Sequence, residues 1–236
     1  AMGFAIVGGL MVAGTLSMQG IVRAQLDQQM WFIFYQPVAF FVYFVAALAE
    51  TNRAPFDMPE AESEIVAGYH TEYSGFRFAL YFLAEYTNIV IVSSIAVTLF
   101  LGGWLRPFPN VGALEFLDYM PIAAMFGLGA ISFLDATREI RPIEKIAMAG
   151  LGGLCFFLGV ALLPPVNQAL GLPILLDYVK NFFWFTVKVF LAVYAFIWIR
   201  FTFPRYRYDQ LMSIGWRWLI PLAIANVIVT GIVMVL

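Results

Sequence analysis

The sequence predicts an all-α protein, a polytopic transmembrane helix bundle with about seven spans in this chain of 236 residues. Three observations predict it. Hydrophobic residues make up 62% of the chain and charged residues only 12%, whereas soluble domains are about 45–50% apolar and about 25% charged. The mean hydropathy is +0.86. Apolar segments recur along the whole chain, and most reach the roughly 20 residues that a helix needs to cross about 30 Å of hydrocarbon.

The predicted spans form a single membrane domain over residues 1–236. In chain order they cover residues 1–22, 30–50, 78–104, 117–134, 145–164, 181–201 and 216–236. The opening AMGFAIVGGL has neither a charged start nor a small-residue cleavage pattern, so we expect a span there and not a signal peptide. Pro37, Pro121 and Pro221 fall within or at the ends of spans, where proline can kink a helix.

The distribution of basic residues predicts which loops face the cytoplasm. Alternating the loops places 51–77, 135–145 and 200–217 on one side of the membrane. That side carries nine of the 13 basic residues, namely Arg53, Arg77, Arg138, Arg141, Lys145, Arg200, Arg205, Arg207 and Arg217. Positive residues favour the cytoplasm. We therefore expect an acidic cytoplasmic loop at 51–77 and a basic, aromatic cytoplasmic loop at 200–217.

Several functions are excluded by composition. The chain has one cysteine, Cys155, and one histidine, His70. An intrachain disulfide is therefore impossible, and no thiolate cluster for zinc or iron–sulfur can be built. We expect no metal site and no redox centre held by this chain. In any redox reaction in which the protein takes part, the electrons must be carried by another molecule. The net charge of −2 gives no argument for nucleic-acid binding.

The segment from Ala49 to Tyr86 holds seven of the chain's 15 acidic residues. Carboxylates are costly near hydrocarbon, so such a cluster between two apolar spans is a functional-site hypothesis. Asp57 and Glu60 also fit a helix start, with Asp57 as N-cap and Glu60 as its capping-box partner.

The helix start does not account for three further acidic residues of this segment, which an ordinary solvated loop would explain. These are Glu62, Glu64 and Glu72. On composition alone, the solvated loop is the favoured interpretation of these three.

Glu50 and Glu85 differ because they adjoin or enter spans. Glu85 lies eight residues past Arg77, roughly 12 Å along a helix. An ionised, unpaired carboxylate at such a depth costs about 2.5 kcal/mol or more. Proton uptake and release is the functional interpretation, and a structural hydrogen bond between helices is the alternative. Lys188, inside the sixth span, is a candidate counter-charge, unless its side chain snorkels towards the nearer interface.

The second loop, RFTFPRYRYDQLMSIGWRW, mixes arginine with aromatic residues. A positive-inside anchor with an aromatic belt explains its end, residues 216–218. Arg205 and Asp209 are spaced i,i+4 and can pair on a short helix. If this loop packs on the acidic one, Arg205 and Arg207 would offset its carboxylates.

Two motifs in these loops resemble one family. ETNRAPFDMPEAESEIVAGYHTEYSG and FPRYRYDQLMSIGW are similar to the signatures of the membrane protein called the H subunit of bacterial respiratory complex I, the NADH-quinone oxidoreductase. Its mitochondrial counterpart is NADH dehydrogenase subunit 1. GGW at 102–104 and FWFTVKVF at 183–190 extend the resemblance to about two-thirds of the chain.

The resemblance implies a quinone-site and energy-coupling subunit of a proton-translocating NADH:quinone oxidoreductase. Such a subunit is a multi-pass protein of the bacterial inner (plasma) membrane. Quinone is the substrate, and the subunit binds no cofactor and carries no redox centre itself. Its partners are peripheral-arm quinone-site subunits and adjacent small membrane subunits.

Three groups of site residues follow from the resemblance, and none of them is catalytic or a metal ligand. Lining of the quinone chamber is implied for Arg53, Phe56, Asp57, Glu60, Glu62, Glu64, Tyr69, Glu72 and Arg77. The intramembrane proton path matches Glu50, Glu85 and Tyr86. Contacts of the second loop are implied for Arg205, Arg207 and Asp209.

The chain departs from the family pattern in two places. The family's N-terminal spans are missing, so we expect a fragment. Between the GGW and FWFTVKVF motifs, the usual short loop is replaced by a longer segment. We expect residues 117–164 to form an inserted transmembrane hairpin whose charged turn, Asp135 to Lys145, faces the cytoplasm. Two added spans preserve the sidedness of the second signature.

Two other functions compete with this interpretation. One is the homologous membrane subunit of an energy-converting hydrogenase, although the intact TNRAPFD and HTEYSG sequences favour the quinone enzyme. The other is a free-standing ion channel or carrier. Such a protein needs a polar pathway across the whole membrane, whereas the charges here cluster on one side.

Overall fold

The computed structural model describes residues 1–51, 53, 55–56, 75–108, 111–138, 142–169, 171 and 173–235. Within these residues every regular element is a helix, so the predicted all-α class is confirmed. The chain divides into two compact units. The first unit comprises Ala1–Leu105 and Phe185–Leu236, and the second comprises Arg106–Trp184.

The first unit contains most of the helices. They are α1 (Met2–Ala13), α2 (Met18–Asp27), α3 (Phe32–Tyr35), α4 (Pro37–Glu50), α5 (Phe76–Phe100), the C-terminal part of α9 (Pro173–Thr202), α10 (Tyr208–Ser213), a π-helical turn (Ile214–Leu219) and α11 (Ile220–Val235). The second unit contains a 3-10 segment (Gly112–Tyr119), α6 (Met120–Arg138), α7 (Pro142–Ala161), α8 (Pro164–Ala169) and the N-terminal part of α9.

The predicted count of seven spans is not confirmed. In the described residues, five helical segments are long and apolar enough to cross a membrane: Phe76–Phe100, Gly112–Arg138, Pro142–Ala161, Ile174–Thr202 and Tyr208–Val235. The count rises to six if α1 and α2, which meet at 55°, form one broken span. α4 is apolar but has only 14 residues.

Local backbone chemistry explains why the first two predicted spans are interrupted. Gly14 has a φ of 65°, and its N–H bonds to the carbonyls of Leu10 and Met11. This left-handed glycine cap ends α1. Gln36, with φ −130°, separates α3 from α4, and Pro37 then occupies the first turn of α4, where its missing N–H is harmless. The proline therefore starts a helix there and does not kink one.

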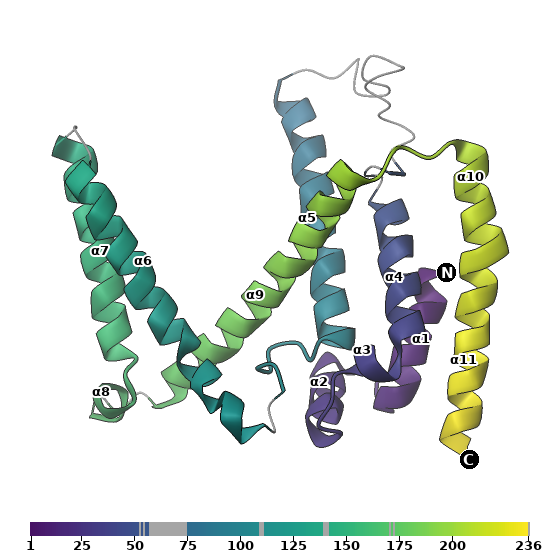
Figure 1. Cartoon of the computed structure of the whole chain (residues 1–236), viewed down its shortest axis with the longest axis horizontal. Coiled ribbons are helices and arrows are strands. Elements are labelled where there is room, and N and C mark those ends of the chain that lie inside the picture. The colour runs from purple at the N-terminus through teal and green to yellow at the C-terminus, as the bar shows by residue number, and fades with distance from the viewer. Residues whose placement is uncertain are drawn as a thin grey trace. The chain divides into compact units, whose positions relative to one another are not determined.

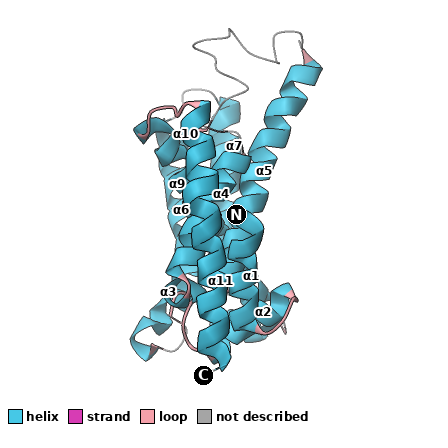
Figure 2. Ribbon diagram, turned by 90° about the vertical axis from the view of Figure 1, so that its right-hand side faces the viewer, coloured by secondary structure: helices cyan, strands magenta, loops and turns pink. Residues whose placement is uncertain are grey.

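The core of the first unit lies where α1, α4 and α11 pack side by side and α5 packs on α4 (Figure 1, Figure 2). Tyr43 and Phe100 are completely buried in it, with ring centroids 5.8 Å apart. The Tyr43 hydroxyl donates a hydrogen bond to the Val92 carbonyl at 2.9 Å. This bond joins α4 to α5, so the two helices that flank the acidic loop are fixed to each other.

In the second unit, α6 and α7 pack against each other. Their contact depends on small residues, because a Cβ on Gly129 would lie 2.6 Å from Phe156 Cδ2. A Cβ on Gly152 would lie 3.1 Å from Phe133 Cδ2. These helices occupy the predicted 117–164 segment, while residues 139–141 of its turn lie outside the described residues. That the segment is inserted, and that its turn faces the cytoplasm, stay predictions.

Candidate functional site at the acidic-loop end of the first unit

One end of the first unit gathers the chain segments of both signature motifs. α4 ends there at Glu50 and α5 begins there at Phe76. The C-terminal end of α9 and the start of α10 lie at the same end (Figure 1). Residues far apart in sequence can therefore meet there.

The central feature of this end is an ion pair between Arg53 and Glu85. The two side chains are 8% and 13% exposed. The guanidinium carbon of Arg53 also lies 4.7 Å from the centre of the Tyr86 ring. Arginine suits such a place because its planar group can pair with a carboxylate and stack on an aromatic face. The structure thus brings Arg53, which is expected in the quinone chamber, into contact with Glu85 and Tyr86, which are expected in the proton path.

Lys188 is therefore not the counter-charge of Glu85, and that hypothesis is wrong. Its amine donates hydrogen bonds to the carbonyls of Leu101, Gly103 and Leu105. It does not snorkel either, because the residue is only 5% exposed. The ion pair that the structure shows for Glu85 is with Arg53 of the first signature.

The second loop contacts the first signature through Tyr206. The rings of Phe56 and Tyr206 stack with centroids 5.6 Å apart and planes 23° apart. The backbone N–H of Tyr206 donates to the Pro55 carbonyl at 3.0 Å. The two loops do pack on each other, but the contact that the structure shows is aromatic and backbone-mediated. The pattern of charges in the sequence pointed to the flanking arginines and gave no reason to select Tyr206.

The expected loop residues lie around the start of α10. Asp209 falls in the first turn of this helix. The backbone N–H of Arg207 donates to the Gln210 side chain at 3.1 Å, which fixes the helix start. Arg205 precedes α10 and is half-buried. The carboxylates that Arg205 and Arg207 are expected to offset lie outside the described residues.

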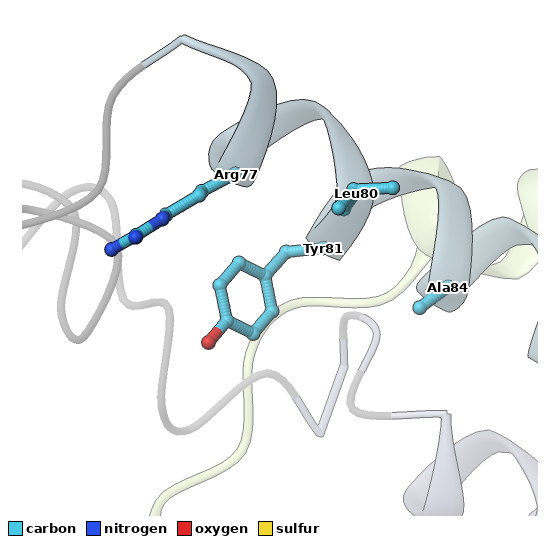
Figure 3. Close-up of a pocket in the computed structure, with 4 residues that line it drawn as sticks. All are labelled: Arg77, Leu80, Tyr81 and Ala84. Carbon is cyan, nitrogen blue, oxygen red and sulfur yellow. The ribbon is translucent and has the colours of Figure 1, made fainter.

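A cavity of about 300 Å³ lies along the first turns of α5. Its described lining is Arg77, Leu80, Tyr81 and Ala84 (Figure 3). These four residues recur at helical spacing, so they share one face of α5. Figure 3 shows the side chains of Arg77 and Tyr81 extending to the same side of the helix. Arg77 is one of the residues expected in the quinone chamber. Tyr81 is not among them, although its i+4 spacing from Arg77 is visible in the sequence.

The remaining site residues divide into two groups. Glu50 ends α4 with an exposed side chain, and Tyr86 is 51% exposed. The others lie outside the described residues and stay predictions: Asp57, Glu60, Glu62, Glu64, Tyr69 and Glu72. In the part of the chain that the structure describes, no three His, Cys, Asp or Glu side chains are grouped to hold a metal ion.

These features define a polytopic α-helical membrane protein with a charged, aromatic site at one end of a helix bundle. Comparison with known proteins specifies the family. A family model described as NADH dehydrogenase matches residues 1–231. The chain belongs to that family.

Individual relatives agree over nearly the whole chain. The chain is 51% identical to the second of two NADH-quinone oxidoreductase H subunits of Solibacter usitatus, over 98% of this chain and 58% of the relative. It is 49% identical to the first H subunit of Koribacter versatilis, over 98% of this chain and 57% of the relative. It is 41% identical to the second H subunit of Rhizobium meliloti, over 98% of this chain and 49% of the relative. The chain spans about half the length of the curated relatives it matches.

Proposed function

We propose that this chain is the quinone-site and energy-coupling membrane subunit of a proton-translocating NADH:quinone oxidoreductase, acting in the bacterial inner membrane. One observation carries the proposal. The Arg53–Glu85 pair, stacked on Tyr86, connects the loop of the first signature to a carboxylate on a membrane-spanning helix. A change of charge at the loop end can therefore act directly on that carboxylate.

The names of the relatives favour this function over the two alternatives. Each of the relatives described above is named as the H subunit of an NADH-quinone oxidoreductase. Neither a hydrogenase subunit nor a free-standing channel is named among these relatives. The partners on this proposal are the peripheral-arm quinone-site subunits and the adjacent small membrane subunits.

The residues take the following roles on this proposal. The chamber for the quinone headgroup is lined by Arg53, Phe56 and Arg77, together with the acidic residues and Tyr69 of the loop. Apolar and aromatic side chains suit the quinone tail, and a few polar groups fix the headgroup. Protons move along Glu50, Glu85 and Tyr86. The chain itself holds no cofactor, and quinone is reduced by electrons from a neighbouring subunit.

The test is Glu85→Gln in the assembled complex. Glutamine keeps the shape and a hydrogen-bonding oxygen but cannot exchange a proton. We expect quinone reduction and proton pumping in proteoliposomes to fall together. The matched control is Glu144→Gln, which removes a carboxylate from the first turn of α7 in the second unit. Full quinone-coupled pumping by an assembled Glu85→Gln complex would contradict the proton-path role.

A further inference from the structure

Lys188 occupies a cage built from three carbonyl groups and one indole ring. Its Nζ atom lies 2.7 Å from the Leu101 oxygen, 3.1 Å from the Gly103 oxygen and 2.6 Å from the Leu105 oxygen. The same nitrogen lies 4.8 Å from the centre of the Trp31 ring. All of these groups belong to the first unit.

The cage matches the chemistry of a primary ammonium group. Three carbonyl oxygens require three N–H donors, and an ammonium group supplies three. The aromatic face attracts the positive charge, most strongly when the ring is tryptophan and the site is dry. The carbonyls also follow the C-terminal end of α5, where the helix dipole favours a cation. In the described residues, no carboxylate forms a salt bridge with Lys188, so backbone and aromatic groups hold its charge.

The backbone conformation of residues 101–105 brings these three carbonyl groups to Lys188. Gly102 and Gly103 have φ values of 74° and 52°, a backbone conformation that residues with a side chain rarely adopt. A Cβ on Gly102 would lie 2.8 Å from Trp31 Nε1, and a Cβ on Gly103 would lie 2.7 Å from a Val22 methyl carbon. Gly102 thus allows the turn to fit beside the indole ring, and Gly103 allows it to fit beside Val22. The GGW motif at 102–104 and the FWFTVKVF motif at 183–190 thus meet at one structural site.

We propose that the 101–105 carbonyls and Trp31 form a binding site for a primary ammonium cation, which the chain fills with its own Lys188. Lys188 is then a positioning residue, which fixes the C-terminal end of α5 to α9. Glu85 lies on the same helix, 15 residues before Phe100, or about 22 Å away. The cation site itself does not depend on quinone chemistry.

Chemical rescue tests the site. Lys188→Ala removes the atoms that correspond to propylammonium and leaves the carbonyls and the indole in place. In the assembled complex we expect its thermal midpoint to fall by several degrees. Propylammonium chloride should then restore most of that loss in a saturable manner, and methylammonium should restore less.

Matched controls separate the site from general effects of the amine. Lys188→Met fills the side-chain space with an uncharged stem, so propylammonium should not stabilise it. Lys180→Ala removes another lysine of α9, and its midpoint should not respond to the amine. Tetramethylammonium, a cation without N–H donors, and 1-propanol, a neutral analogue, should not rescue Lys188→Ala.

Two results would overturn the proposal. One is an assembled Lys188→Ala complex that no primary ammonium ion stabilises. The other is equal rescue by tetramethylammonium or 1-propanol, because neither supplies a cation with three donors. If Lys188→Ala does not assemble, Trp31→Phe and Trp31→Leu give an independent test, since both keep the lysine. We expect the thermal midpoint to fall from the wild type to Trp31→Phe and further to Trp31→Leu. Equal midpoints for all three would contradict a contribution of the Trp31 ring to the cation site.

Discussion

Breaking the Arg53–Glu85 pair should destabilise the subunit far more than removing both partners together. Glu85→Gln leaves a guanidinium group, 8% exposed, without its carboxylate. Arg53→Met removes the guanidinium group together with its contact with Tyr86. The double variant Arg53→Met/Glu85→Gln removes both charges of the pair, so we expect it to recover most of the loss.

The expected magnitude follows from the burial of the pair. Removing one partner of a buried pair costs about 3–5 kcal/mol, and we take about 3 kcal/mol because both side chains keep a small exposure. Glutamine still offers an oxygen to Arg53, which lowers the cost of Glu85→Gln to about 2 kcal/mol. The stacking on Tyr86 contributes about 0.5–2 kcal/mol and is lost only with Arg53. With about 1 kcal/mol of residual cost in the double variant, these single costs correspond to a coupling energy of about 4 kcal/mol between the two sites.

The assay is the rate at which the subunit dissociates from the purified complex at a fixed, elevated temperature. A cost of about 3 kcal/mol that is fully relieved in the transition state for dissociation speeds that step about 160-fold. The double variant should lose the subunit several-fold faster than the wild type at most. Arg106 and Asp118 give the matched control, since their pair is 15% and 36% exposed. Exposed pairs contribute about 0–1 kcal/mol, so this second cycle should show little coupling.

Additive effects of Arg53→Met and Glu85→Gln would refute the reasoning, because independent sites show no coupling. A second comparison separates stability from function. We expect the double variant to regain stability without regaining proton pumping, since it has no carboxyl group at position 85. Full recovery of pumping would mean that Glu85 acts only as the partner of Arg53.

Three further outcomes are expected. Gly129→Ala should lower the thermal midpoint of the complex, because its Cβ meets Phe156 and overpacking costs about 1–3 kcal/mol. Gly127→Ala, which has open space at its Cβ, should leave the midpoint unchanged. Equal effects of the two variants would contradict the close packing of α6 and α7. Phe56→Leu removes a stacked aromatic pair that contributes about 0.5–1.5 kcal/mol, so proteolysis near Tyr206 should become faster, and unchanged proteolysis would count against the loop contact. In the variant Glu139→Cys, a thiol reagent should label the cysteine from the cytoplasmic side. Labelling from the periplasmic side alone would exclude the expected sidedness of the 117–164 hairpin.

The fold class was predictable because it depends on composition, and apolar segments of span length are visible without any tertiary information. The span count was less predictable. Apolar runs continue through Gly14 and through Gln36–Pro37, where the backbone in fact breaks the helices. A single glycine or proline changes mean hydropathy little, yet it decides where a helix ends.

The candidate site was only partly predictable for a different reason. Sequence indicated that Glu85 needed a partner, and Lys188 in the sixth predicted span was a candidate counter-charge. The partner is Arg53, which the irregular chain after α4 brings to Glu85. Likewise, the charge pattern of the second loop drew attention to Arg205 and Arg207, whereas the contact that the structure shows is between Tyr206 and Phe56. Pairings between distant segments depend on helix packing, which periodicity and spacing do not specify.

The contact between Pro55–Phe56 and Tyr206 constrains the order in which the subunit matures during synthesis. Arg53 can meet Glu85 as soon as α5 has been made, but Tyr206 emerges about 150 residues after Phe56. At a synthesis rate of about 5–20 residues per second, Phe56 waits roughly 8–30 s for its partner ring. During that interval the intervening helices are made while Pro55 and Phe56 still lack their contacts with Tyr206. A neighbouring subunit that engages this end early would therefore meet a different surface from the one it meets in the finished chain.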